Sequence, residues 1–362
     1  MRNRTRVLVL AVLAACRIPD VTFTRGGDGS GGPGGPGEPA SDAPLDSPID
    51  ATPPPQLRSC NNLPSNCGAS GTGYCCDSSV VFGGMFLRDS DVAHDGHSGS
   101  TNYPATVSDF RLDKYEVTVG RFRAFVQAGM GTQATAPASG DGAHPKLANS
   151  GWDSAAYSPQ LEATTAAMIA ELNGSSDSTW IDIATPDSEN RPINMVTWFE
   201  AMAFCIWDGG YLPTEAEWLY AAAGGNQQRA FAWSDPPGLT TITPARASFS
   251  PQMDQCNGGG PPGCTVDDLI KVGTRPQGDG RWGQSDLTGN VFEWNLDWLG
   301  NYKLPCIDCA ILDKPVPPNP VYRIMRGGSF VSPADDLRTT LRDVQTPSDR
   351  KYITGIRCAR AP

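Results

Sequence analysis

The sequence predicts a mixed α+β fold with limited regular secondary structure, and three observations support this prediction. Glycine and proline contribute 40 and 32 of the 362 residues, and this content favours turns and loops over long helices. A few short segments carry complete helix-start signals. The other apolar runs are short and are separated by Gly, Pro and Asp, which is typical of strands and loops. An all-helical fold is therefore not expected.

Three segments predict short helices. The first runs from Thr118 to Gln127 and follows a strand-like run. The second begins at Thr197, whose hydroxyl can accept a hydrogen bond from the amide of Glu200 while the Glu200 carboxylate reaches back. The third begins with the same device at Thr214-Glu215-Ala216-Glu217. From Pro236 to Pro362 the pattern predicts strands and loops without a long helix.

The first 16 residues predict a bacterial lipoprotein signal. Three arginines lie within Met1 to Arg6, an apolar run follows from Val7 to Ala15, and small residues precede Cys16. The apolar run is far shorter than the roughly 20 residues that a membrane span needs. We expect Cys16 to be the acylated N-terminus, so that the protein is lipid-anchored in the bacterial cell envelope and meets the membrane only through that anchor. An ordinary cleaved secretory peptide is the alternative.

The signal is followed by a tether and then by a cysteine-rich cap. Residues 17–58 are dominated by Gly, Pro, Ser and Asp and predict a disordered tether. Residues 59–77 contain Cys60, Cys67, Cys75 and Cys76 and predict a small cap held by disulfides, with metal binding as the alternative. Acylation of Cys16 would leave ten of the 11 cysteines, an even number that suits pairing.

The charge of the chain excludes one class of partner. The sequence has 28 basic and 39 acidic residues, which gives a net charge of −11. This charge repels phosphate backbones. We therefore do not expect a nucleic acid partner.

Five segments in order make the chain resemble the sulfatase-modifying factor (formylglycine-generating enzyme) family. They are Val81-Phe82-Gly83-Gly84-Met85-Phe86, Lys114-Tyr115-Glu116-Val117-Thr118, the block Pro192 to Gly225 with Leu212-Pro213-Thr214-Glu215-Ala216-Glu217-Trp218, Leu287-Thr288-Gly289-Asn290-Val291-Phe292-Glu293-Trp294, and Arg326-Gly327-Gly328-Ser329-Phe330 continuing to Gly355-Ile356-Arg357-Cys358. The resemblance covers residues 78–362 and implies a C-type lectin-like fold.

The family resemblance also implies a copper site that this sequence lacks. Members that oxidise a sulfatase cysteine to formylglycine hold copper through two thiols just after Gly-Gly-Ser, and soft thiolates suit Cu(I). Here that segment, Val331 to Arg338, has no cysteine, and none occurs between Gly328 and Cys358. Tyr211 also stands where the family usually has the arginine of Arg-Leu-Pro-Thr-Glu. We therefore expect no copper.

These differences predict a non-oxidase binding or scaffold module that recognises a peptide, a glycan or another envelope protein. The alternative is a formylglycine-generating oxidase acting on a sulfatase cysteine, or another oxidase activity of the family. The related sulfoxide synthases bind iron through histidines of an added helical domain. This chain has only His94, His97 and His144, and His94 and His97 lie in a polar loop that predicts a solvated segment.

Three groups of residues carry over from the family by position. A disulfide is implied between Cys205 and Cys358, whereas the pairing of Cys256, Cys264, Cys306 and Cys309 stays open. A structural calcium site, made of hard oxygen ligands, is implied at Asp286, Gly289, Val291 and Glu293. The floor of a substrate groove is implied near Trp294, Ser329, Phe330 and Arg338. For Trp294 a place in the core is the alternative, and for Arg338 it is an ion pair.

Overall fold

The computed structural model describes residues 57–61, 63–64, 66–93, 103–252, 255–316, 318 and 321–362. All the described residues belong to one compact unit, Pro53–Pro362. The predicted signal peptide, Cys16 and the tether up to residue 56 lie outside the described residues. Within the described ranges, no helix is both long enough and apolar enough to cross a membrane.

The unit contains short α-helices and short 3₁₀ helices. The α-helices are α1 (Val119–Gln127), α2 (Ser154–Tyr157), α3 (Thr165–Leu172), α4 (Trp198–Trp207) and α5 (Glu215–Ala222). The 3₁₀ helices are η1 (Arg58–Cys60), η2 (Gln133–Thr135), η3 (Ser158–Gln160), η4 (Ser188–Asn190), η5 (Gly225–Gln227), η6 (Val266–Asp268), η7 (Pro276–Gly278) and η8 (Ala334–Leu337). The three helices expected from the sequence correspond to α1, α4 and α5.

The start signals of α4 and α5 work as the sequence predicts. The Thr197 hydroxyl accepts from the Glu200 amide at 3.2 Å, and the Glu200 carboxylate accepts from the Thr197 amide at 3.0 Å. Thr214 and Glu217 form the same reciprocal pair at the start of α5. These bonds satisfy amides that have no partner inside the helix.

Three small sheets make up the β structure. The strands are β1 (Ser78–Val81), β2 (Gly84–Arg88), β3 (Tyr103–Val107), β4 (Phe110–Asp113), β5 (Phe292–Trp298), β6 (Cys306–Ile307), β7 (Arg323–Arg326), β8 (Asp343–Gln345), β9 (Thr354–Gly355) and β10 (Ala359–Arg360). They are ordered β1-β4-β10, β2-β3-β6 and β8-β7-β5-β9. This mixture of few helices and short strands confirms the predicted α+β class.

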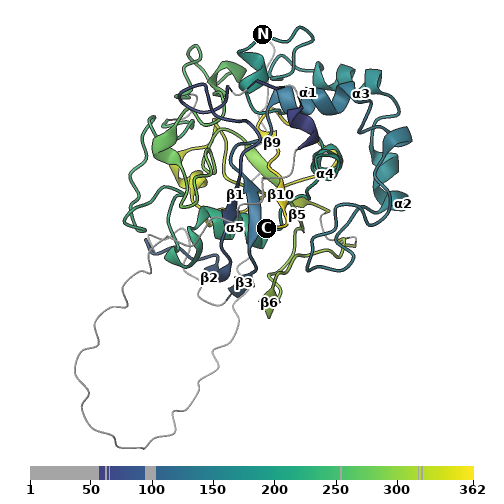
Figure 1. Ribbon diagram of the computed structural model, residues 1–362. Helices are drawn as coiled ribbons and strands as arrows, with labels where there is room; N and C mark the ends of the chain where they lie inside the picture. Colours follow the sequence, from purple (N-terminus) through teal and green to yellow (C-terminus); the bar gives the residue numbers. More distant parts are fainter. Residues whose placement is uncertain are drawn as a thin grey trace, which may run out of the picture. The chain divides into compact units, whose positions relative to one another are not determined.

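Two buried clusters join the helices to the sheets. In one cluster α4 contacts both α1 and β5, through side chains that include Phe122, Phe204 and Trp294. In the other, α5 contacts β2 and β3 with side chains that include Trp218 and Phe86, and it also contacts β5 and β7 (Figure 1). All seven residues of β5 are buried because this strand lies between β7 and β9. Both clusters draw on segments far apart in the sequence.

Candidate functional site

The cysteine-rich cap is fastened to the rest of the unit at its first turn. Disulfides join Cys60 to Cys76 and Cys67 to Cys75. Ser59 is the middle residue of η1, and its backbone amide donates a hydrogen bond to the carboxylate of Asp208 at 2.8 Å. These bonds hold η1 beside the C-terminal end of α4, where Asp208 is the cap residue.

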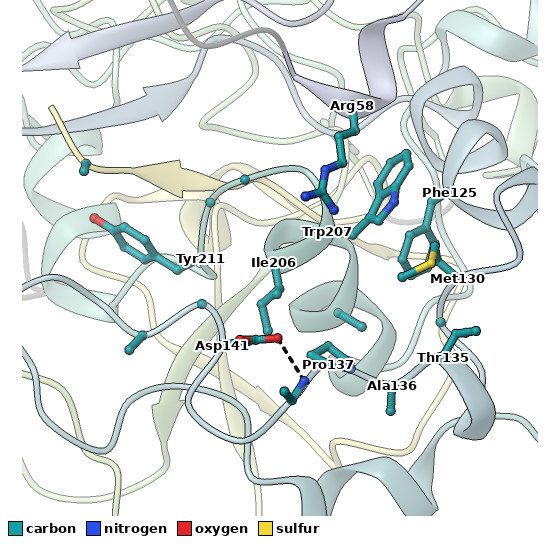
Figure 2. Close-up of a pocket in the computed structure, with 18 of the residues that line it drawn as sticks. Arg58, Phe125, Met130, Thr135, Ala136, Pro137, Asp141, Ile206, Trp207 and Tyr211 are labelled. Carbon is teal, nitrogen blue, oxygen red and sulfur yellow. Dashed lines mark hydrogen bonds between the residues drawn. The ribbon is translucent and has the colours of Figure 1, made fainter.

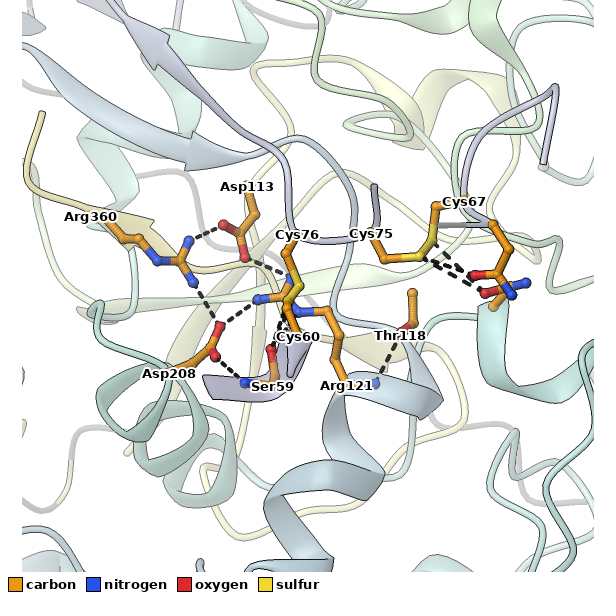
Figure 3. Close-up of a disulfide and its surroundings, with 12 residues drawn as sticks. Ser59, Cys60, Cys67, Cys75, Cys76, Asp113, Thr118, Arg121, Asp208 and Arg360 are labelled. Atoms are coloured by element: carbon orange, nitrogen blue, oxygen red, sulfur yellow. Dashed lines mark hydrogen bonds and ion pairs between the residues drawn. A yellow bond between two sulfur atoms is a disulfide. The ribbon is translucent and has the colours of Figure 1, made fainter. Parts of the chain in front are cut away.

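Beneath η1 lies a buried cluster of four charged side chains (Figure 3). Arg121 pairs with Asp113 at 2.9 Å and with Asp208 at 2.6 Å, and its Nε donates to the Ser59 hydroxyl at 3.0 Å. Arg360 pairs with the same two carboxylates. Burial opposes the charged form of Arg121, but the two carboxylates outweigh it and raise its pKa above the usual value. Two guanidinium groups and two carboxylates therefore neutralise one another in the interior.

A pocket of about 560 Å³ opens beside η1 (Figure 2). Its apolar floor comes from α1, from α4 and from the loop after α1, and includes Phe125, Met130, Ile206 and Trp207. Arg58 extends into the pocket, with Tyr211 on one side of its side chain and Trp207 on the other. Concave apolar pockets of this size with a few polar groups are typical small-molecule sites.

A second pocket of about 400 Å³ shares Tyr211 and Pro145 with the first. Its wall contains Glu217, whose Oε1 accepts from the Tyr211 hydroxyl at 2.8 Å and lies 3.1 Å from His144 Nε2. The Lys146 amide donates to His144 Nδ1, which leaves the proton on Nε2. Burial and the Glu217 carboxylate together raise the pKa of Tyr211, so its hydroxyl stays a neutral donor.

Comparison with known proteins identifies the fold. A model of the sulfatase-modifying factor enzyme 1-like domain matches residues 68–362, most of the chain. The chain belongs to this family. It is 32% identical to the formylglycine-generating enzyme of Streptomyces coelicolor over 260 residues, which cover 69% of this chain and 77% of that protein. It is 28% identical to hercynine oxygenase of Mycolicibacterium smegmatis, covering 81% of this chain and 62% of that protein.

Among solved structures, PvdO from Pseudomonas aeruginosa matches with a TM-score of 0.49 and 20% identity, covering 80% of this chain and 95% of that one. The family match begins at residue 68, inside the segment predicted as the cap. In this family member the cap and the following domain therefore form one compact unit.

The residues predicted for the family's groove are buried in this member. Trp294 has no exposed surface, and its Nε1 donates to the Val196 carbonyl at 3.1 Å. Ser329, Phe330 and Arg338 are buried as well, and none of the four predicted residues lines either pocket described above. The core position weighed for Trp294 is therefore the one observed, and the groove itself stays a prediction.

The residues predicted for calcium lie in the segment that leads into β5. Asp286, Gly289 and Asn290 have positive φ angles of 60°, 84° and 62°, which form a tight turn before the strand. The Asp286 carboxylate accepts from the Gly273 amide at 2.6 Å. The Glu293 carboxylate pairs with Arg357 at 2.7 Å. Both carboxylates are buried.

Burial raises the pKa of two acids in and beside this segment. Burial raises the pKa of Asp286 to about 6. Burial, together with the Asp286 and Glu293 carboxylates, raises the pKa of Glu116 well above its usual value. Arg357 lowers the pKa of both Glu116 and Asp286 and so opposes the effect of burial. In the described part of the chain no group of three or more His, Cys, Asp or Glu side chains is placed to hold a metal, so an ion here would need backbone carbonyls as well.

All ten described cysteines form disulfides. The structure joins Cys205 to Cys358, the pair that the family implies, and resolves the open pairing as Cys256 with Cys264 and Cys306 with Cys309. Sequence reasoning identified neither pocket nor the charged cluster, because Arg58, His144 and Asp208 belong to no motif. The one available signal was Tyr211, which replaces the usual arginine and lines both pockets.

Proposed function

We propose that this family member is an envelope-anchored binding or scaffold module without oxidase activity, which recognises a peptide, a glycan or another envelope protein. The observation that carries the proposal is the missing thiol pair. The segment Val331 to Arg338 contains no cysteine, and each cysteine in the described ranges is tied up in a disulfide. Cu(I) needs soft thiolate ligands, and a disulfide sulfur does not supply them.

The segment that replaces the copper-binding loop supports the same proposal. The Ser332 hydroxyl accepts from the Ser329 amide at 3.0 Å, so it is used within the turn. Asp335 and Asp336 lie in η8 and offer hard carboxylate oxygens, which disfavour Cu(I). Cys306 and Cys309 could be considered as substitutes, but their disulfide leaves no thiol for a metal.

The test is a formylglycine assay with the purified protein. The protein is incubated with copper, a reductant and a peptide carrying Cys-x-Pro-x-Arg, and mass spectrometry follows the conversion of thiol to aldehyde. The Streptomyces coelicolor enzyme serves as the positive control. We expect no conversion by this protein under conditions in which the control turns over. Conversion that is lost in Cys306→Ser would contradict the proposal.

An oxidase is the second candidate, and similarity to formylglycine-generating enzyme over 69% of the chain favours it. The assay above separates the two functions because only an oxidase converts the peptide thiol to the aldehyde. The anchor at Cys16 and the calcium at Asp286, Gly289, Val291 and Glu293 belong to the proposal as well. The predicted ion would hold the turn before β5 and have a structural role, since the segment leads directly into the core.

A further inference from the structure

The pocket beside η1 has an apolar floor and one cation at its rim. Phe125 and Trp207 form an edge-to-face pair with ring centroids 5.4 Å apart. Trp207, Met130 and Ile206 are half-buried, so part of each side chain remains accessible from the pocket. An accessible apolar floor of this kind gains free energy when a ligand removes it from water.

Arg58 differs from the other arginines near this pocket. Arg121 and Arg360 are buried and paired with carboxylates. Arg58 is exposed, and its side chain makes no hydrogen bond or ion pair with the residues that the structure describes. Its guanidinium can therefore bind an incoming group without first breaking a contact. Carboxylates fit best, because a guanidinium can donate two parallel hydrogen bonds to them.

The residues that line the pocket include one acid, Asp141. The Asp141 carboxylate accepts from the Ala138 amide at 2.9 Å and so holds the loop that forms one wall (Figure 2). The η1 backbone that carries Arg58 is held by the Cys60–Cys76 disulfide and by the Ser59 bond to Asp208. A site whose backbone is fixed in advance loses less entropy on binding.

We propose that this pocket binds an amphipathic organic carboxylate, with the carboxylate at Arg58 and an aromatic or aliphatic body on Phe125, Met130 and Trp207. The site shares no residue with the segment Val331 to Arg338. The inference therefore goes beyond the proposed function, and its failure would leave the formylglycine result unaffected.

The experiment compares three probes that share one ring system and differ in charge. They are 2-naphthoate, 2-naphthamide and 2-naphthylmethylamine, titrated into the full protein by calorimetry at low ionic strength. A charge-assisted bidentate contact predicts that the acid binds at least about tenfold more tightly than the neutral amide. Equal affinity of acid and amide, tightest binding of the amine, or no binding of any probe at millimolar concentration would overturn the proposal.

Variants test whether Arg58 is the source of the preference for the carboxylate probe. Arg58→Gln changes an exposed side chain, and we expect it to reduce the affinity for naphthoate to that for naphthamide. Lys351→Gln removes the same charge from another exposed position and should leave the preference unchanged. Trp207→Ala should weaken both probes, with the melting temperature as the check on folding. A preference for naphthoate that survives in Arg58→Gln, or that is lost equally in Lys351→Gln, would show that the carboxylate binds elsewhere.

Discussion

The Cys205–Cys358 disulfide allows a quantitative test of how the C-terminal segment is held. It joins residues 153 positions apart, whereas Cys256 and Cys264 are 8 positions apart. A disulfide restricts the unfolded chain more when it closes a longer loop. In the chain-entropy model, removing the long-range bond costs about 5 kcal/mol of unfolding free energy, and removing the short-range bond costs about 2.5 kcal/mol.

The difference in burial between the two disulfides also makes the loss of the Cys205–Cys358 bond the larger one. Cys205 and Cys358 have no exposed surface and lie in the largest core cluster. Replacing both by alanine leaves unfilled volume there, which adds to the loss. Cys256 and Cys264 are half-buried, so their replacement adds little. The double variant Cys205→Ala/Cys358→Ala should therefore lose at least about 2.5 kcal/mol more than Cys256→Ala/Cys264→Ala.

Denaturant unfolding without reductant measures both double variants against the unsubstituted protein. Equal losses in the two variants would refute the loop-length reasoning. A direct check is peptide mapping of the native protein after alkylation without reduction. Recovery of alkylated Cys205 would show that the bond is absent.

Three further predictions follow from the charges and from the N-terminus. Arg121→Met should lower the unfolding free energy by about 3–5 kcal/mol, because it leaves Asp113 and Asp208 buried with one fewer cation. A loss below about 1 kcal/mol in denaturant unfolding would contradict this prediction. Calcium at a hundredfold excess over its Kd should stabilise the protein by about 2.7 kcal/mol, measured by calorimetry with and without a chelator. Asp286→Ala should abolish this stabilisation, and the absence of any calcium response would show that the predicted site does not exist. Cys16→Ser should release the protein from the membrane fraction, and unchanged retention would count against the anchor.

The sequence predicts those helices whose signals are local. The starts of α4 and α5 depend on residues three positions apart, so Thr197 with Glu200 and Thr214 with Glu217 suffice to predict them. The start of α3 was missed. Its Thr164 cap accepts from the Ala167 amide, but no acid stands at the third position and only two of its residues are buried. A helix of this kind is stabilised by tertiary packing, which sequence periodicity records weakly.

The pocket and the charged cluster could not be predicted because they depend on long-range contacts. Arg58 is placed at the pocket by η1, whose Ser59 amide bonds to Asp208, 149 positions along the chain. Arg121 lies in a helix that the sequence does predict, but its full burial becomes understandable only with the carboxylates of Asp113 and Asp208 beside it. Single charged residues without a motif carry no signal about such partners.

The motifs that identify the family contact one another in the buried core. They therefore indicate the fold of the protein more than its chemistry. Trp218 of the Leu-Pro-Thr-Glu-Ala-Glu-Trp segment donates through Nε1 to the Glu293 carboxylate at 2.6 Å. Glu293, of the Gly-Asn-Val-Phe-Glu-Trp segment, pairs at 2.7 Å with Arg357 of the last segment. Three of the most specific motifs thus meet at one buried carboxylate, where a lost partner would leave a charge unpaired in the core.

These contacts give the motifs a role in the fold whether or not an oxidase site is present. Two of the departures from the family pattern lie elsewhere, in the segment from Val331 to Arg338 and at Tyr211. Tyr211 gives Glu217 a neutral hydroxyl donor in place of a guanidinium, and it lines both pockets. Because the core contacts are present while the thiols and this arginine are replaced, the two pockets that Tyr211 lines are the first places to test for ligand binding.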